Sequence, residues 1–251
     1  MDISEFSRLE DKGRYSRHPW EESRKNVLLR LLGKTGLEFP VKRIVDIGSG
    51  DAYVIHALQD KGIAQEYFAI DTAYTPQVIA QLKENNPESK VVYVQDLETY
   101  LRDYNTADPV LYLCMDVLEH LPNESLILDH LKPGNNHYFF AVPAFQEVFS
   151  QHDVLLGHYR RYTRKQLKEL LEKNGFKVSQ SGYYFTSLLV FRWIEKLLGR
   201  DKKASIDNWK GSDAKTDFIN AVLLGDFSAG NAFQSIGIRI PGLSCYCQCT
   251  K

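Results

Sequence analysis

The chain has 251 residues, of which 43% are hydrophobic and 25% charged, which is typical of a globular protein and excludes a disordered or collagenous chain. At roughly 100–200 residues per domain, we expect one core domain with appended segments. The formal net charge of −1 gives no overall basic character for binding a nucleic acid backbone, so nucleic acid is not the expected partner.

The sequence predicts a cytoplasmic protein without a transmembrane segment. The N-terminal segment has no apolar stretch that could serve as a signal peptide, and no run approaches the roughly 18 apolar residues that a membrane span needs. The longest apolar segment, 185–198, is interrupted by three charged residues. We interpret it as a helix packed on the domain, with a dimer contact or a peripheral membrane contact as the alternatives.

Strands and helices alternate along most of the chain. A polar N-terminal tail leads into a predicted helix at Trp20–Leu32, whose apolar residues recur at helical spacing and which we expect at the edge of the sheet. Short apolar runs rich in β-branched or aromatic residues predict strands at 43–48, 67–71, 90–94, 110–115, 137–142 and from 176 onward. Helical spacing and capping residues predict helices at 53–58, 76–85, 123–131 and 163–174. This alternation predicts βαβ units and a largely parallel sheet.

The C-terminal part has a different pattern. We expect a polar insertion at 200–212, then a helix, then a final strand at Leu243–Thr250. Because strand side chains alternate, three cysteines should share one buried face of this strand. We predict no metal site there, since their two-residue spacing is poor for a tetrahedral ion. The predicted divisions are 1–40 (tail and lid helix), 41–199 (core) and 200–251 (segments that complete the core).

A glycine-rich turn follows the first predicted strand, at Asp46-Ile-Gly48-Ser49-Gly50. Such a turn before a helix lets a ligand approach the backbone closely. Asp71 follows the second strand at the separation expected for an acid that binds ribose hydroxyls. The pattern indicates a nucleoside-containing cofactor, with a simple packing turn as the alternative.

Further acids narrow the choice of cofactor. A carboxylate at Asp46 would repel a pyrophosphate but would favour a cationic amino-acid group. Asp96 follows the third strand, and Met115–His120 follows the fourth. Polar groups therefore lie at the carboxyl ends of four consecutive strands, where open α/β sheets bind their ligands.

These segments resemble the class I S-adenosylmethionine-dependent methyltransferases, in the small-molecule branch that includes ubiquinone- and menaquinone-biosynthesis enzymes. The resemblance covers about 20–176 and is most specific at Asp116-Val-Leu-Glu-His-Leu121. It implies a Rossmann-like α/β fold, with a seven-stranded, mostly parallel sheet, helices on both faces and one antiparallel strand near the C-terminus. Ala52 departs from the family, in which many members have a third glycine, and we expect closer packing there rather than lost binding. The cofactor-binding residues that we predict are Asp46, Gly48, Ser49, Gly50, Asp71, Thr72, Asp96, Leu97, Met115, Asp116 and Val117.

The expected acceptor site is the 145–162 loop, which leaves the same edge of the sheet. It carries His152 and His158, our candidates for a catalytic base because histidine titrates near neutral pH. We predict substrate contacts from His120, Tyr159, Arg160 and Arg161, with an arginine as an anion contact. The alternative is a loop whose polar groups satisfy its own backbone. An aromatic lid formed by the 14–24 segment is expected to cover the cofactor, with a surface helix as the alternative.

The predicted function is methyl transfer from S-adenosylmethionine to an unidentified small-molecule acceptor. An NAD(P)-dependent oxidoreductase uses a similar turn and acid, but Asp46 and the lack of a hydride-transfer pattern argue against it. A non-catalytic S-adenosylmethionine-binding protein is the third alternative, because methyl transfer requires no obligatory catalytic side chain.

Overall fold

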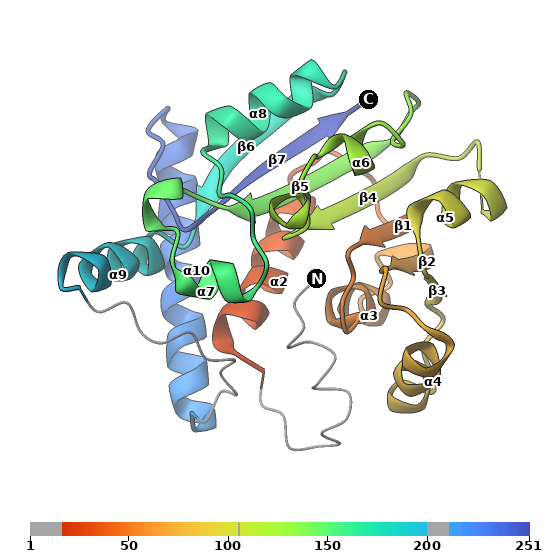
Figure 1. Ribbon diagram of the computed structural model, residues 1–251, viewed down its shortest axis with the longest axis horizontal. Coiled ribbons are helices and arrows are strands. Elements are labelled where there is room, and N and C mark those ends of the chain that lie inside the picture. Colours follow the sequence, from red (N-terminus) through yellow and green to blue (C-terminus); the bar gives the residue numbers. More distant parts are fainter. Residues whose placement is uncertain (1–16, 105, 200–210) are drawn as a thin grey trace.

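Seven strands form the central sheet of the computed structural model, which describes residues 17–104, 106–199 and 211–251. They are β1 (Val41–Ile47), β2 (Ala64–Ile70), β3 (Val92–Val94), β4 (Val110–Met115), β5 (His137–Pro143), β6 (Lys177–Tyr184) and β7 (Ser244–Thr250). Their order is β3-β2-β1-β4-β5-β7-β6, and only β7 runs antiparallel to its neighbours (Figure 1). The predicted seven-stranded, mostly parallel sheet is confirmed.

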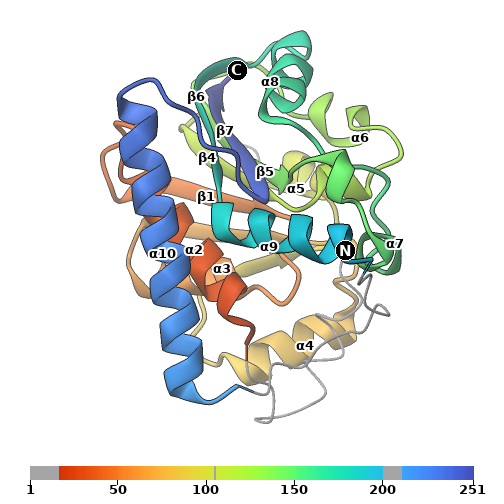
Figure 2. The ribbon, with the colours of Figure 1, turned by 90° about the vertical axis from the view of Figure 1, so that its left-hand side faces the viewer.

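Helices cover both faces of this sheet (Figure 2). One face packs against α2 (Pro19–Leu32), α3 (Tyr53–Asp60), α4 (Pro76–Asn85) and α10 (Asp213–Ser235). The other face packs against α5 (Leu97–Asp103), α6 (Ser125–Leu128) and α8 (Arg164–Lys173). The two buried clusters lie on opposite sides of the strands, which explains why β4 is buried along its whole length.

Local capping explains the helices whose ends the sequence predicts best. The Thr75 hydroxyl accepts a hydrogen bond from the N–H of Val78, and Pro76 occupies the first turn of α4. Thr163 and Gln166 form a reciprocal capping box at the start of α8. Gly175 then ends α8 with φ +85°, a conformation that favours glycine.

Two helices differ from their predictions, and a third was not predicted. α2 lies on a face of the sheet beside α10, where Ser23 bonds Asn220, rather than at the sheet edge. α6 has a single turn instead of 123–131, and the Leu128 carbonyl at its end accepts Lys251 Nζ in place of a further helical N–H. α5 was not predicted, although Asp96 caps its first turn.

The C-terminal strand matches its prediction. Cys245, Cys247 and Cys249 are buried in one cluster, and Tyr246 packs in the cluster on the opposite face. Burial raises the pKa of the Cys247 thiol to about 12, so this cysteine is a packing residue rather than a nucleophile. The predicted insertion at 200–212 lies almost entirely outside the described residues.

Segment 185–198 packs on the core only near its beginning, through Phe185, Leu188 and Leu189. It forms α9 (Thr186–Leu197), whose only fully buried residue is Leu189. Its exposed apolar residues are Val190, Phe191, Trp193, Ile194 and Leu197. None of the helices in the described part of the chain combines the length and apolar character needed to cross a membrane. The dimer and peripheral-membrane alternatives for 185–198 stay predictions.

Gly242 supplies a test of how tightly β7 is inserted. A Cβ atom at this position would lie 2.6 Å from the carbonyl carbon of Tyr184, which is backbone and cannot move aside. We expect Gly242→Ala to lower the free energy of unfolding by about 1–3 kcal/mol, the usual cost of overpacking. Denaturant titration measures this difference.

Gly225→Ala is the matched control, because a Cβ atom there meets nothing within 4 Å in the middle of α10. Alanine favours the helix by up to about 1 kcal/mol, so this variant should be at least as stable as the parent protein. Equal stability of both variants would contradict the tight contact at Gly242.

Candidate active site

A cavity of about 930 Å³ opens at the carboxyl ends of β1 to β5. Ile47, Ile70, Met115 and Pro143 line it from four different strands, and Ser244 reaches it from the start of antiparallel β7. The predicted convergence of strand ends is therefore present. Its volume is at the upper end of the roughly 300–1,000 Å³ typical of ligand sites, which is enough for a cofactor and a second molecule.

The glycine-rich turn lines one end of the cavity. Gly48 has φ +73°, and a Cβ atom there would collide with the Val117 side chain, so only glycine fits. Gly48, Ser49 and Asp51 line the cavity. Ala52 has φ +61°, a left-handed conformation that favours glycine, and it is fully buried.

Two buried carboxylates flank this turn. The Ser49 hydroxyl donates to Asp46 at 2.8 Å, and burial raises the pKa of Asp46 to about 7. The Asp71 carboxylate accepts the N–H groups of Gly50 at 2.9 Å and Ala73 at 3.0 Å. Burial raises the pKa of Asp71, and these two backbone bonds partly offset the effect. Asp71 therefore both holds the turn and presents a carboxylate to the cavity.

The remaining predicted cofactor residues fall into two groups. Those that line the same cavity are Thr72, Asp96, Leu97, Met115, Asp116 and Val117. Gly50 does not line it but bonds Asp71. Asp96 also caps α5 through the N–H and hydroxyl of Thr99, so its carboxylate has a structural role besides any contact with a ligand.

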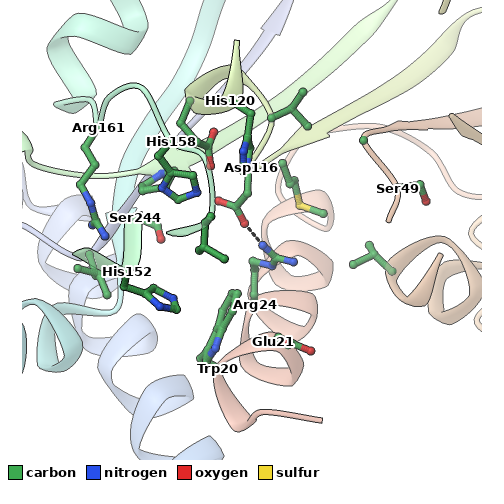
Figure 3. A pocket seen from close by; sticks show the side chains of 18 of the residues that line it. Trp20, Glu21, Arg24, Ser49, Asp116, His120, His152, His158, Arg161 and Ser244 are labelled. Atoms are coloured by element: carbon green, nitrogen blue, oxygen red, sulfur yellow. Dashed lines mark ion pairs between the residues drawn. The ribbon is translucent and has the colours of Figure 1, made fainter. Parts of the chain in front are cut away.

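The beginning of α2 crosses the middle of the cavity. Arg24 forms an ion pair with Asp116, and this pair lies between Ser49 on one side and the His120–His158 pair on the other (Figure 3). Arg17 pairs with Asp51 at 2.6 Å, and Trp20 also lines the cavity. Within the predicted 14–24 lid, residues 17–24 thus border the cavity, and 14–16 lie outside the described residues.

The 145–162 loop contains a buried Asp–His–Arg network. It includes the short helix α7 (Gln151–Leu155), where Asp153 is fully buried and also accepts from Ser150. Asp153 lies 2.9 Å from Nδ1 of His158 and 2.7 Å from Nε of Arg161. Burial opposes ionisation of Asp153, but these two partners hold its pKa well below the usual range. His158 is consequently fixed in one orientation at the cavity wall.

His158 belongs to a second group of polar residues on the same wall. Its ring packs edge-on against His120 at 4.6 Å between centroids (Figure 3). Glu119, on the turn after β4, is fully buried, and neither of its carboxylate oxygens has a hydrogen-bond partner among the described residues. Ligand atoms of Glu119, His120 and His158 lie within 4.8 Å of one another. We call these three residues the Glu–His–His cluster.

Some predicted substrate contacts are not supported. Tyr159 is 59% exposed, and neither it nor Arg160 lines the cavity. Arg160 instead bonds Glu124 at 2.6 Å and the Pro122 carbonyl, so it anchors the loop to the neighbouring turn. His120 and Arg161 do line the cavity.

His152 also lines the cavity but lies apart from the His120–His158 pair (Figure 3). Arg161 is engaged by Asp153, which makes it a support for His158 rather than an open anion clamp. Of the two predicted catalytic histidines, His158 is the one that bonds Asp153.

Comparison with known proteins identifies the family. A family model described as "Methyltransferase domain" matches residues 17–181, which is more than half of the chain. The chain belongs to this methyltransferase family. This confirms the resemblance to class I S-adenosylmethionine-dependent methyltransferases that the sequence indicated.

Individual relatives of this methyltransferase are distant. A ubiquinone biosynthesis O-methyltransferase of Proteus mirabilis is 30% identical over 105 residues, which cover 40% of this chain and 41% of that protein. The match thus spans about two fifths of the relative's length.

Solved structures share the fold at low identity. The putative methyltransferase in complex with the Trm112 activator of Haloferax volcanii has a TM-score of 0.56 at 14% identity, covering 100% of this chain and 98% of that one. Phosphoethanolamine N-methyltransferase 2 of Haemonchus contortus, in complex with S-adenosyl-L-methionine, has a TM-score of 0.54 at 16% identity, covering 95% and 54%.

The residues of this methyltransferase fit S-adenosylmethionine. The Gly48 backbone gives close access, Asp71 offers carboxylate oxygens that can accept from ribose hydroxyls, and Asp46 can pair with a cationic amino group. A phosphate-rich dinucleotide could use Asp71 for its ribose but would gain nothing from the buried Asp46 beside its turn.

Asp46 predicts a pH dependence of cofactor binding. Its pKa of about 7 results from burial, with Asp71 and Asp51 raising it further and Ser49 and Arg24 lowering it. Below pH 7 the free protein holds a neutral carboxyl group, and a bound ammonium group favours the carboxylate. Affinity should therefore rise with pH, by about tenfold between pH 6 and pH 8. Calorimetry with S-adenosylhomocysteine at several pH values measures this.

Asp46→Asn is the control, since it keeps the size of the side chain and cannot ionise. The affinity of the variant should no longer change with pH through this group, and any pH dependence that remains belongs to other groups. An equal pH dependence of affinity in both proteins would contradict the assignment of the titrating group to Asp46.

Several functional candidates were missed by the sequence analysis. Glu119 stood within the recognised motif but was not singled out, and Asp153 was seen only as part of a polar loop. Residues of α9 and α10 that line the cavity carried no chemical signal, because apolar side chains at helical spacing usually indicate core packing. The clue available for Asp153 was its spacing of three from Ser150, a capping-box pattern that the structure contains.

Proposed function

We propose that this protein transfers the methyl group of S-adenosylmethionine to a hydroxyl group of a small-molecule acceptor. The observation that carries the proposal is the single cavity. It continues from the glycine turn and Asp71 to the Glu–His–His cluster, so a cofactor and an acceptor can occupy it together. The named O-methyltransferase relative supports oxygen as the methylated atom.

The cofactor end would be formed by the turn and the strand ends that follow it. Asp71 would bind the ribose, Asp46 the amino-acid portion, and Val117 and Leu97 would supply apolar contacts. The bound sulfonium supplies an electrophilic methyl group. What the protein must then provide is the orientation of the acceptor, since alignment of reacting groups supplies several kcal/mol of barrier lowering.

The acceptor end combines apolar walls with a polar corner, and further polar residues such as His152 and Ser244 also line the cavity. This composition suits a molecule that has an apolar or aromatic body and one ionisable hydroxyl. The apolar residues that line this end are Val148, Phe149, Leu156, Phe185, Leu188, Ile219, Leu223 and Leu243.

The polar corner is the Glu–His–His cluster. A hydroxyl group is a poor nucleophile until it loses its proton, and a group positioned to accept that proton typically contributes 10²–10⁴-fold to the rate. Asp153 orients His158 for this role, and Arg161 in turn holds Asp153. We therefore place the reacting oxygen beside His158.

Binding and turnover measurements test the proposal. The purified protein is titrated by calorimetry with S-adenosylmethionine, S-adenosylhomocysteine, NADH and NADPH, and we expect the first two alone to bind. It is then incubated with S-adenosylmethionine and a panel of hydroxylated aromatic compounds, and release of S-adenosylhomocysteine is followed.

The other outcomes discriminate between the alternatives. Binding of NADH or NADPH without S-adenosylmethionine would support an oxidoreductase. Tight S-adenosylmethionine binding with no turnover across oxygen, nitrogen, carbon and sulfur acceptors would support a non-catalytic binding protein. Turnover with amine acceptors alone would contradict oxygen as the methylated atom.

A further inference from the structure

Glu119 is a buried carboxyl group for which the surrounding protein provides too few partners. Its side chain is 0% exposed and lines the cavity, and neither oxygen has a hydrogen-bond partner among the described residues. Arg24 and Arg161 lie near enough to act on its charge but form no hydrogen bond with it. An uncompensated buried acid is costly, so its retention calls for a partner from outside the chain.

Two histidines lie beside the Glu119 carboxylate, where such a partner would bind. His120 follows Glu119 directly, and His158 approaches from the 145–162 loop, with the ligand atoms of all three residues within 4.8 Å of one another. A carboxylate and two imidazoles, brought together from two separate segments of the chain, form a donor set that is frequent in metal sites.

The surroundings of His158 also match those of a metal ligand. A metal-bound histidine almost always directs its second ring nitrogen to a carboxylate or carbonyl group, which fixes its tautomer. Asp153 does this here, at 2.9 Å from Nδ1, and leaves Nε2 as the nitrogen available to an ion. Arg161 and Ser150 hold Asp153 in turn, so the orientation of the ring is set in advance.

We propose that Glu119, His120 and His158 bind a divalent first-row transition ion, such as Zn²⁺ or Mn²⁺. Imidazole ligands favour these ions over Mg²⁺ and Ca²⁺, which prefer oxygen. Three protein ligands leave coordination positions open toward the cavity, as in catalytic rather than structural metal sites. A single bound ion would account both for the Glu119 carboxylate, which has no hydrogen-bond partner among the described residues, and for the Asp153–His158 pair.

The role of the ion rests on the proposed function, whereas its binding does not. With the ion bound, His158 is a ligand rather than the proton acceptor, and the ion takes over the activation of the acceptor. A hydroxyl oxygen bound to the ion loses its proton to solvent more readily, because the positive charge stabilises the oxyanion. That oxygen then forms a bond to the methyl carbon while the carbon–sulfur bond of the sulfonium breaks. Neutral S-adenosylhomocysteine leaves, and neither the ion nor the acceptor changes oxidation state.

Metal binding is tested on the chelator-stripped full chain, without cofactor or acceptor. We titrate ZnCl₂ and MnCl₂ by calorimetry, with MgCl₂ and CaCl₂ as comparisons, and expect one Zn²⁺ or Mn²⁺ site per chain. Glu119→Gln and His158→Gln should each weaken that site at least tenfold. Asp153→Asn should weaken it about 10–100-fold, the usual effect of losing the partner of a ligating histidine.

The matched control is His137→Ala, which removes a histidine at the opposite edge of the sheet, where β5 begins. It should bind the ions as the parent protein does. Melting temperature and affinity for S-adenosylhomocysteine in the presence of chelator show whether each variant is folded. Glu119→Gln preserves the size of the buried side chain and should pass both checks.

Absence of a stoichiometric site for any of these ions would overturn the proposal. So would equal binding by the parent protein and the folded Glu119→Gln variant, because the ions would then bind elsewhere. Neither result would affect the proposed methyl transfer, which is judged by S-adenosylmethionine binding and turnover. Conversely, a protein that binds the ion but not S-adenosylmethionine would retain the metal site and lose the proposed function.

Discussion

Replacing His158 by alanine should lower kcat at least about 100-fold while the affinity for S-adenosylhomocysteine changes by less than about twofold. The variant loses the ring that Asp153 orients beside the reacting oxygen, and positioned groups of this kind contribute 10²–10⁴-fold to the rate. The cofactor end of the cavity keeps all its residues. The measurement compares kcat with any acceptor that supports turnover and S-adenosylhomocysteine affinity by calorimetry.

Tyr159→Ala is the neighbouring control for this prediction. The Tyr159 side chain is exposed and lies outside the cavity, so kcat should stay near that of the parent protein. If His158→Ala turns over normally, the acceptor reacts elsewhere. If cofactor affinity and melting temperature fall together with kcat, the loop around His158 is structural.

Asp71→Ala should weaken binding of S-adenosylmethionine at least about tenfold. Hydrogen bonds to a charged acceptor contribute roughly 1.5–3 kcal/mol each, and the ribose offers two hydroxyl donors. The same carboxylate also accepts the N–H groups of Gly50 and Ala73, so the turn loses its support as well. Calorimetry with S-adenosylmethionine measures the combined effect.

Adenosine separates the two contributions of Asp71. If ribose contacts dominate, adenosine and S-adenosylhomocysteine should lose affinity by similar factors, because both carry the ribose. Asp103→Ala is the control, since Asp103 pairs with Arg102 on the surface and does not line the cavity. Unchanged affinity of Asp71→Ala would show that the ribose-binding acid is misassigned.

The parts of the fold that the sequence predicted well are those set by local interactions. The bounds of α4 are given correctly because Thr75 and Pro76 define its start. Those of α8 are given to within one residue, because Thr163, Gln166 and Gly175 define its ends. β4 is equally clear, since its six residues are all buried and apolar. In each case the decisive contacts lie within a few residues along the chain.

The errors arose where distant residues decide the structure. α6 ends early because Lys251, more than a hundred residues away, occupies the Leu128 carbonyl. α9 has the apolar pattern of a packed helix, yet most of its apolar face lies outside the core. Hydrophobic periodicity shows which face is apolar but does not show what covers it.

The candidate site likewise contains residues that local sequence patterns predict and residues that only folding brings together. Gly48 and Asp71 were predicted because a turn and a strand end have a recognisable spacing. The Glu–His–His cluster could not be predicted from spacing, since Glu119 and His158 meet only after the 145–162 loop folds back over the turn that follows β4. Tyr159 and Arg160 do not line the cavity, although they are adjacent in sequence to His158 and Arg161, which do.

The antiparallel strand β7 has a consequence for how the nascent chain folds. β5 and β6 both pair with β7 and not with each other, yet about 60 residues separate the end of β6 from the start of β7. During synthesis both strands therefore leave the ribosome with an unpaired edge, and such edges are prone to intermolecular pairing. The growing polypeptide must keep these edges apart from other chains until residues 244–250 have been translated and can insert between them.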